Sequence, residues 1–382
     1  MSKILFEITE EHLETGLRGF PVGYCTTSSV DPQKGLFYRG VAVKELAYKK
    51  PEEVIYLLYF GKEGSKQEIE QFFRRLQKKA VLKQETLRAI YALPRQGHPM
   101  KMLSCAVLIL GMLEKEDDYQ EDGLSLIAKI PQLTAHVINH HAGWKGEDFS
   151  ASLGYMENFT HMLGCPGGQK KELEAVFKLF NILHYDHGGG NLSTFVAKAV
   201  ASGLEDMYGS IASSFCALEG PRHGRANQDC LEFLHLLKKE VGSSLSRKEV
   251  EAFIRKRIEE KQLIFGFGHA VLRVEDPRAC VMYEFLHQHY GENPLVKLAQ
   301  LLREEGSKVL AENAKITNPH PNVDAASGVM LSVAGFDYPH YFTLLFAMSR
   351  TVGIVRQMIY ERCEARGGKG TPIVRPKYFY SD

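Results

Sequence analysis

Histidine, aspartate and arginine residues recur in five irregular segments that interrupt the helical pattern of the chain. These segments span residues 187–191, 220–227, 265–269, 318–328 and 367–376. Each contains glycine or proline, and each carries at least one His, Asp or Arg. In a helical protein, such breaks are places where backbone N–H groups and side chains converge on a ligand. These five segments are therefore the first candidates for a functional site.

The residue types suit carbon-acid chemistry on a polycarboxylate. An Asp is a weak base toward a C–H bond, so it needs a donor such as His to stabilise the enolate oxygen at the same moment. A second His can polarise an electrophilic carbonyl, and Arg residues bind carboxylates through two hydrogen bonds. The alternative is structural, because His and Arg in loops often cap helices or satisfy buried carbonyls.

Several other chemistries lack their motifs. Gly266-Phe267-Gly268 begins like a dinucleotide-binding loop, but position 271 is Val and no strand precedes it. The sequence contains no Walker A motif, no G-x-S-x-G elbow and no H-E-x-x-H. His184 and His187 have a spacing that suits a metal, but we find no third and fourth ligand. We therefore expect a site without metal.

Helices must position these segments, because most of the chain has helical periodicity. Pro51 predicts a helix start and Gly61 its end, and Asn293-Pro294 predicts another start. Residues 341–365 predict one long, mostly apolar helix. The strand signal is confined to residues 20–43, where a turn at 31–35 predicts one hairpin. The predicted fold class is all-α with a small N-terminal β-hairpin.

Composition narrows the partners and the compartment. The 382 residues include 47 Lys and Arg and 46 Asp and Glu, a balance that argues against nucleic acid or an anionic membrane as the main partner. The seven cysteines form no C-x-x-C, which predicts a reduced intracellular protein. The longest apolar run is too short to span a bilayer. The first residues, MSKILFEITEEH, show no signal peptide, so we expect a cytoplasmic protein.

The same segments resemble citrate synthases, most closely the form found in eukaryotes. Residues 184–191 match H-x-D-H-x-G-G-N, and residues 220–227 match G-P-x-H-G-x-A-N. Residues 266–278 match G-[FY]-G-H-A-V-[LY]-R-x-x-D-P-R, residues 321–324 match P-N-V-D, and Ser349-Arg350 match S-R. The motifs keep the family's order and spacing, and residues 16–40 resemble its beginning. The resemblance therefore covers nearly the whole chain.

The resemblance implies three catalytic residues. Asp324 is expected to take a methyl proton from acetyl-CoA, and His223 to hydrogen-bond the thioester oxygen. His269 is expected to donate to the ketone oxygen of oxaloacetate as the enol carbon attacks. The citryl-CoA that forms would then be hydrolysed in the same site to citrate and CoA.

The resemblance also implies binding residues. The expected contacts to the oxaloacetate and citrate carboxylates are His187, Arg278, Arg350 and, from the other subunit, Arg375. The expected contacts to acetyl-CoA are Arg273, Lys315 and Arg18 at the phosphates, with the backbone at Gly266, Gly268 and Ala270. Acetyl-CoA and CoA act here as substrate and product, so no cofactor and no metal are expected.

The resemblance further implies a homodimer of two-domain chains. A large helical domain is expected to combine residues 1–223 and 335–382, and a small domain to span residues 224–334. The catalytic groups would then come from both sides of a cleft, so closure of the small domain would assemble the site and exclude water. We expect oxaloacetate to bind first. The expected location is the cytoplasm of a bacterium.

Alternative interpretations stay open at this point. A 2-methylcitrate synthase would use propionyl-CoA, and one methylene is worth only about 1–3 kcal/mol in discrimination. A non-catalytic acyl-CoA or citrate sensor, or a helical interaction scaffold, would not turn over at all. Asp324 could simply cap the next helix. Gly188, Phe265 and Ala326 depart from the family pattern, and the turn at 367–370 makes the arm before Arg375 unusually flexible.

Overall fold

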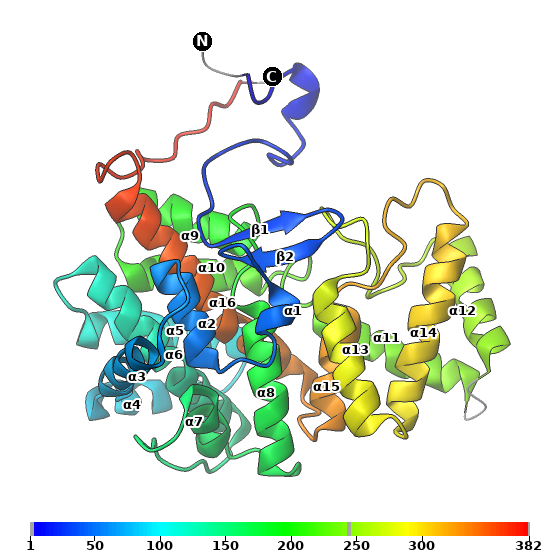
Figure 1. The fold of residues 1–382 in the computed structure, drawn as a ribbon, viewed down its shortest axis with the longest axis horizontal. Coiled ribbons are helices and arrows are strands. Elements are labelled where there is room, and N and C mark those ends of the chain that lie inside the picture. Colours follow the sequence, from blue (N-terminus) through cyan, green and yellow to red (C-terminus); the bar gives the residue numbers. More distant parts are fainter. Residues whose placement is uncertain (1–3, 243–245, 381–382) are drawn as a thin grey trace.

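A succession of helices follows one small sheet near the N-terminus (Figure 1). The computed structural model describes residues 4–242 and 246–380. Residues 1–3, part of the segment on which the expected absence of a signal peptide rests, lie outside the described residues. The predicted all-α fold class is confirmed, with a single small sheet within the described part of the chain.

The sheet contains the predicted hairpin and one additional short strand. Strands β1 (Ser28–Asp31) and β2 (Gly35–Tyr38) pair antiparallel with Ser28 opposite Tyr38. Asp31 closes the turn between them, because its Oδ1 accepts the N–H groups of Gln33 and Lys34 at 2.9 Å. Strand β3 (Val41–Ala42) then pairs with β2. The sequence predicts the two strands of the hairpin but not this third strand.

The N-terminal part of the chain supplies ten helices. They are α1 (Val43–Leu46), α2 (Pro51–Phe60), α3 (Lys66–Ala80), α4 (Gln84–Tyr91), α5 (Pro99–Glu114), α6 (Tyr119–Ala142), α7 (Tyr155–Met162), α8 (Lys170–His184), α9 (Leu192–Ser202) and α10 (Met207–Leu218). A short 3-10 helix (Glu10–His12) precedes the sheet. The predicted bounds of α2 are confirmed, because Pro51 is its first residue and Gly61 ends it with a φ of 78°.

Five further helices lie together on one side of the molecule (Figure 1). They are α11 (Ala226–Val241), α12 (Arg247–Glu259), α13 (Pro277–Tyr290), α14 (Pro294–Ala311) and α15 (Asp324–Val333). Asn293 caps α14 as predicted, since its side chain accepts the N–H of Leu295 at 2.9 Å. The division of the chain into a large and a small domain stays a prediction.

Helix α16 (Phe342–Ile359) occupies the centre of the fold and is buried along its whole length. A 3-10 turn (Pro339–Tyr341) precedes it, and a π-helical turn (Tyr360–Glu364) follows it. The predicted helix at 341–365 is therefore mainly α16, extended by the π turn. Because α16 packs against α6, α8, α9 and α10, its side chains are held rigidly.

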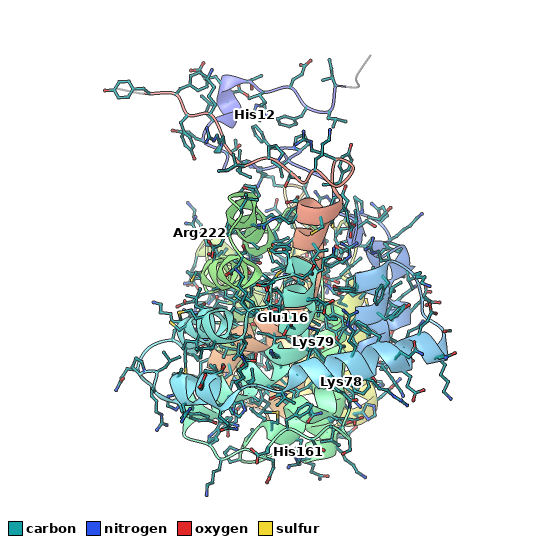
Figure 2. The ribbon with its side chains drawn as sticks, turned by 90° about the vertical axis from the view of Figure 1, so that its left-hand side faces the viewer. His12, Lys78, Lys79, Glu116, His161 and Arg222 are labelled. Carbon is teal, nitrogen blue, oxygen red and sulfur yellow. The ribbon has the colours of Figure 1, made fainter. Side chains whose placement is uncertain are left out.

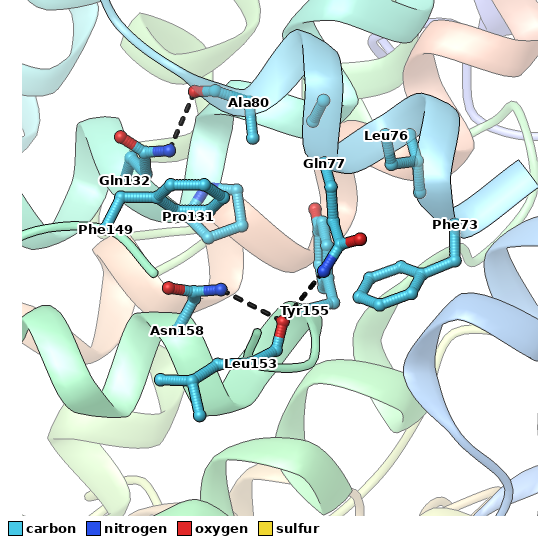
Figure 3. A pocket seen from close by; sticks show the side chains of 11 residues that line it. Phe73, Leu76, Gln77, Ala80, Pro131, Gln132, Phe149, Leu153, Tyr155 and Asn158 are labelled. Atoms are coloured by element: carbon cyan, nitrogen blue, oxygen red, sulfur yellow. Dashed lines mark hydrogen bonds between the residues drawn. The ribbon is translucent and has the colours of Figure 1, made fainter. Parts of the chain in front are cut away.

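A proline inside α6 and a tyrosine of α7 that compensates for it line the same small cavity (Figure 3). Pro131 has no N–H to donate to the carbonyl of Ile127, one turn earlier. The hydroxyl of Tyr155 donates to that carbonyl instead, at 2.7 Å. The cavity beside Pro131 measures about 20 Å³, which is room for about one water. Its lining contains none of the candidate site residues, so we treat it as a packing gap.

The two ends of the chain extend away from the helical body (Figures 1 and 2). His12 lies on the N-terminal segment, clear of the helices (Figure 2). The C-terminal arm follows the π turn and exposes Tyr378 and Tyr380. Among the described residues, no helix combines the length and the apolar character needed to cross a bilayer.

Candidate active site

Two of the predicted segments are joined by backbone hydrogen bonds. Gly268 donates its N–H to the carbonyl of His320 at 3.0 Å, and Asn322 donates to the carbonyl of Gly266 at 2.9 Å. The side chain of Asn322 adds a bond from Nδ2 to the carbonyl of Gly268 at 3.1 Å. The pairing brings the segment before His269 beside the segment before Asp324.

Glycine at position 266 is required by this pairing. Gly266 has a φ of 85°, and a Cβ atom there would lie 2.9 Å from the Cβ of Ala325. A side chain would therefore meet both backbone strain and a steric clash. The close approach of the two segments explains why the G-x-G sequence occurs here without a dinucleotide-binding fold.

The backbone fixes the protonation of His269. Its Nδ1 accepts the N–H groups of Val271 at 3.0 Å and Leu272 at 2.9 Å. Because burial and the nearby Arg278 lower the pKa of His269, the ring is neutral at pH 7. A neutral ring that accepts at Nδ1 carries its proton on Nε2. His269 therefore presents an Nε2–H donor.

His223 presents a donor by the opposite arrangement. Its Nε2 accepts the N–H of Ser193 at 3.2 Å and lies 2.9 Å from the Ser193 hydroxyl oxygen. Burial, with Arg350 adding to it, lowers the pKa of His223 to about 4. The neutral ring thus carries its proton on Nδ1. Both histidines are neutral hydrogen-bond donors at pH 7.

His187 lies in a turn that its neighbour Asp186 anchors. The buried Asp186 carboxylate accepts hydrogen bonds from the hydroxyls of Thr27 and Ser28 and from Gln357 Nε2 at 2.9 Å. The His187 ring lies 5.2 Å from the His269 ring, centre to centre. Its Nε2 is buried and has no partner among the described residues, so it is available to a ligand.

Two buried arginines face the same region. Arg278 at the start of α13 forms a two-bond ion pair with Asp276, at 3.0 and 2.7 Å. Although burial alone would raise the pKa of Asp276, Arg278 lowers it to about 2. In α16, Arg350 donates from Nε to the carbonyl of His184 at 3.1 Å, and burial lowers its pKa to about 10.

Arg350 retains capacity for a carboxylate. Its guanidinium carbon lies 4.6 Å from the ring centre of Phe346, which fixes the plane of the group. Within the described part of the chain, its two terminal nitrogens have no hydrogen-bond partner. A guanidinium with its two ends free binds a carboxylate through two parallel hydrogen bonds.

Asp324 is the first residue of α15, but it does not cap that helix. The N-cap position is Val323, and no side-chain cap bond is present. The backbone N–H of Asp324 instead donates to Asn322 Oδ1 at 3.0 Å. Burial raises the pKa of the Asp324 carboxyl to about 6, although Arg278 and Arg350 act to lower it. The capping interpretation is therefore wrong.

Ring contacts link these groups: the His223 ring lies 6.4 Å from the Phe346 ring against which Arg350 stacks, and the His187 ring lies 5.2 Å from the His269 ring. Arg278 and Arg350 shift the pKa of both His187 and Asp324. The segments involved follow α8 or belong to α13, α15 and α16. The site therefore combines two neutral donors, one carboxylate with a raised pKa and two buried arginines. Such a set can hold an anionic substrate and move a proton from carbon.

Four other residues predicted to bind CoA or the substrate carboxylates are not part of this buried cluster within the chain. Arg273 donates from Nη1 to the carbonyls of His269, Val271 and Leu272, so it braces its own loop. Lys315 is exposed after α14. Arg18 and Arg375 are exposed in the two terminal segments that leave the body. Ala270 and Gly268 lie in the paired loop beside His269.

His184 packs in the core and does not join a metal site. Its ring stacks on Phe180 at 4.1 Å, and its Nδ1 bonds the carbonyl of Phe180 at 2.7 Å. Burial, together with Arg278 nearby, lowers its pKa to about 3. Across residues 4–242 and 246–380, no group of three or more His, Cys, Asp or Glu is placed to hold a metal ion.

Three residues that support the site are not predicted from the sequence: Ser193, Asn322 and Phe346. Ser193 acts on His223, which is 30 positions away, so spacing along the chain gives no signal of the contact. Asn322 lies inside the P-N-V-D motif, and its polar side chain next to a helix start was a usable signal. Phe346 lies one helical turn before Arg350, a spacing that places both on one face of α16.

Comparison with known proteins agrees with the fold and with the motifs. Residues 16–377 match the family described as "Citrate synthase, C-terminal domain". Citrate synthase 4, mitochondrial, of Arabidopsis thaliana is 34% identical over 400 residues, covering 98% of this chain and 82% of that protein. Citrate synthase, mitochondrial, of Daucus carota is 33% identical over 399 residues, covering 98% and 83%.

Solved structures give the same result. Citrate synthase from Thermotoga maritima has a TM-score of 0.82 at 30% identity, covering 97% of this chain and 96% of that chain. The Thermoplasma acidophilum enzyme, solved in a ternary complex with carboxymethyl coenzyme A and oxaloacetate, has a TM-score of 0.82 at 25% identity, covering 96% of each. The resemblance inferred from the motifs is confirmed, and this chain belongs to the citrate synthase family.

Proposed function

We propose that this chain condenses acetyl-CoA with oxaloacetate and hydrolyses the resulting citryl-CoA to citrate and CoA. One observation carries the proposal: a carboxyl with a pKa raised to about 6, Asp324, lies in one region with two neutral imidazole donors. A base and two donors of fixed orientation are what enol formation and carbonyl addition require. Membership of the citrate synthase family supports the same reaction.

In the proposed first step, the Asp324 carboxylate removes a proton from the methyl carbon of acetyl-CoA. The electron pair of that C–H bond becomes the C=C bond of the enolate, the carbonyl π pair moves to the thioester oxygen, and this oxygen accepts a hydrogen bond from His223 Nδ1–H. The raised pKa of Asp324 makes it a stronger base than an ordinary carboxylate. Neutral His223 donates without the cost of creating a second charge.

In the proposed second step, the enolate carbon attacks the ketone carbon of oxaloacetate. The ketone oxygen accepts a hydrogen bond from His269 Nε2–H as the new C–C bond forms, and the proton that Asp324 took from the methyl carbon ends on this oxygen as the hydroxyl of citryl-CoA. His187, Arg278 and Arg350 hold the carboxylates of oxaloacetate, so the ketone is fixed in orientation. Water then adds to the thioester carbonyl of citryl-CoA, and CoA leaves as the thiol.

The CoA contacts and the partner subunit are also proposals. Arg273, Lys315 and Arg18 would bind the CoA phosphates, and Gly266, Gly268 and Ala270 would line the adenine and pantetheine side. We propose a homodimer in which Arg375 enters the site of the other subunit. The exposed position of Arg375 on an arm that leaves the body supports this proposal. No metal and no resident cofactor is part of the proposed reaction.

We propose that the enzyme works in a bacterial cytoplasm. All seven cysteines are free thiols, which supports a reducing compartment. The relatives from Arabidopsis thaliana and Daucus carota are named as mitochondrial proteins. Cell fractionation followed by activity assays separates the two locations, because mitochondrial activity would contradict the proposal.

Product identification tests the proposed function. The enzyme is incubated with oxaloacetate and either acetyl-CoA or propionyl-CoA, and the organic acids formed are identified by NMR. Citrate formed faster than 2-methylcitrate supports the proposal. Faster 2-methylcitrate formation indicates the propionyl-CoA enzyme instead. No product, with thermal stabilisation by oxaloacetate plus CoA, indicates a sensor, and no stabilisation at all indicates a scaffold.

A further inference from the structure

A buried ion pair that no step of the proposed reaction uses lies beneath the turn that follows His187. Lys198 Nζ in α9 lies 2.7 Å from Glu361 Oε1 in the π turn. The two side chains expose only 9% and 15% of their surface. Because desolvating two charges costs several kcal/mol, such a pair is weak evidence for stability alone. Its neighbours indicate another role.

The pair forms part of the floor on which the turn rests. A Cβ atom on Gly189 would lie 3.1 Å from both Lys198 Nζ and Gln357 Oε1. Gln357 Nε2 donates to Asp186 Oδ1 at 2.9 Å and to the carbonyl of Gly188 at 3.3 Å. Residues on both sides of His187 thus contact this floor. The height of the turn therefore depends on where Lys198 and Gln357 are held.

The same two elements anchor the C-terminal arm. Thr371 donates its N–H to the carbonyl of Glu361 at 2.9 Å. Val374 donates its N–H to the hydroxyl of Ser202, the last residue of α9, at 3.0 Å. Arg375 follows directly. The α9–π turn junction therefore lies between the turn after His187 and the base of the arm.

We propose that Lys198 and Glu361 are positioning residues for oxaloacetate. Their ion pair fixes the turn at residues 188–191, and so the orientation of the His187 ring, relative to the base of the arm. Neither side chain touches the substrate. This inference rests on the proposed function, because the ligand of His187 is taken to be oxaloacetate.

The variant Lys198→Met tests the proposal. It keeps the length of the side chain but removes the charge, so the turn loses its support. The KM for oxaloacetate is expected to rise about tenfold, with kcat changed less than about threefold, since binding and not chemistry is weakened. Lys198→Arg, which preserves the charge, is expected to restore most of the affinity.

The variants are expected to fold. The ion pair lines a cavity of about 180 Å³, so water can hydrate a Glu361 carboxylate that has lost its partner. Glu361→Gln provides a second test, because it has nearly the same shape and is expected to raise the same KM. If the two residues act as one unit, the double variant is no worse than either single variant.

Lys129 and Glu114 provide a matched control. Their ion pair has a length of 2.8 Å and exposures of 9% and 3%, and it joins α5 to α6. Lys129→Met is expected to lower the Tm and leave the KM for oxaloacetate unchanged. If Lys198→Met behaves in the same way, the pair is merely structural and the proposal is wrong.

Failure of the proposed function is distinguishable from failure of this inference. Calorimetry measures oxaloacetate binding whether or not citrate forms. A wild-type chain that binds oxaloacetate without turnover refutes the proposed function alone, and weaker binding by Lys198→Met would still support the positioning role. Equal oxaloacetate affinity in wild type, Lys198→Met and Glu361→Gln would overturn the positioning role of this ion pair.

Discussion

The protonation of three side chains follows from contacts that each one makes. His223 accepts at Nε2 and His269 accepts at Nδ1, so each neutral ring has its proton on the other nitrogen, which has no hydrogen-bond partner among residues 4–242 and 246–380. Asp324 is held among buried groups without a capping role. A carboxylate in such surroundings is a stronger base than an exposed carboxylate, and its charge destabilises the folded state. Both consequences can be measured.

The first prediction concerns stability. The pKa of Asp324 is raised from 3.8 to about 6 in the folded state, so ionising it at pH 7 works against folding. Asp324→Asn is therefore expected to increase the free energy of unfolding at pH 7 by about 1–3 kcal/mol. Urea unfolding measures this difference. A variant less stable than wild type at pH 7 would contradict the assigned environment.

The pH dependence of that difference checks its origin. The carboxyl favours the folded state fully below its unfolded pKa of about 4, and this contribution is lost as pH rises to about 6. The advantage of Asp324→Asn is therefore expected to shrink when the pH is lowered from 7 to 5. A difference independent of pH would indicate a packing effect.

The second prediction concerns the rate. The base must be ionised, so kcat/KM for acetyl-CoA is expected to fall as pH drops through about 6. The pKa of His223, about 4, lies too low to affect this range. A steady-state pH profile measures the transition. A profile that stays flat down to pH 5 would show that another group, or an unshifted Asp324, sets the rate.

At the scale of elements, two loops act as one because their backbones pair. Asn322 Nδ2 donates to the carbonyl of Gly268 across the pairing, and Asn322 Oδ1 accepts the N–H of Asp324 within its own segment. Asn322→Ala is expected to lower kcat about 10- to 100-fold, because the base and His269 lose their fixed separation. Steady-state kinetics with saturating substrates measures this effect.

Asn313→Ala is the control for that variant. Asn313 Oδ1 accepts the N–H of Lys315 at 3.0 Å in a similar local turn, outside the pairing. The kcat of Asn313→Ala is expected to stay within about twofold of the wild-type value. Equal kcat losses in the two variants would mean that general loosening of the loop, and not the pairing, causes the effect.

Helix α16 lies so close to the turn after α8 that it requires glycine at one position. A Cβ on Gly353 would clash with Asp186 Oδ1 and lie 2.5 Å from the carbonyl oxygen of Tyr185. Gly353→Ala is expected to lower the free energy of unfolding by about 1–3 kcal/mol. Gly190→Ala, with nothing within 4 Å, serves as control. Equal stabilities in chemical denaturation would contradict this packing.

The sequence predicts elements well where a local signal exists. Pro51 with Gly61, Asn293 with Pro294, and the turn at 31–35 all mark boundaries that the structure confirms. The third strand and the π turn lack such signals. Strand β3 has only two residues and forms because they pair with β2. The π turn differs from an α-helix only in its hydrogen-bond register, which depends on tertiary contacts. The side-chain roles of Ser193 and Asn322 depend on such contacts too.

At the scale of the whole molecule, the family match follows from motifs spread over nearly the full chain. Those motifs give the identity of the candidate site residues, because four of them coincide with breaks between helices and the fifth, Ser349-Arg350, lies on the central helix α16. They do not show where Arg375 acts, since its arm leaves the body and its ligand is proposed to lie on a second chain. Assembly therefore needs its own test.

Mixed dimers test the placement of Arg375. If Arg375 enters the partner's site, one chain with Arg375→Ala and one with Asp324→Asn together form one intact site. Subunit exchange between the two inactive variants is then expected to recover about a quarter of wild-type activity, since half the dimers are mixed and each has one working site. No recovery, despite mixed dimers shown by native mass spectrometry, would place Arg375 in its own chain's site.

The central claim is that Asp324 removes the proton from acetyl-CoA in a site that oxaloacetate completes. The most direct measurement is release of CoA thiol from acetyl-CoA, with and without oxaloacetate, by wild type and by Asp324→Asn, with a blank for the seven free cysteines. We predict release that requires oxaloacetate and falls about 10²–10⁴-fold in the folded variant. Equal release by the variant, or release without oxaloacetate, would contradict the claim.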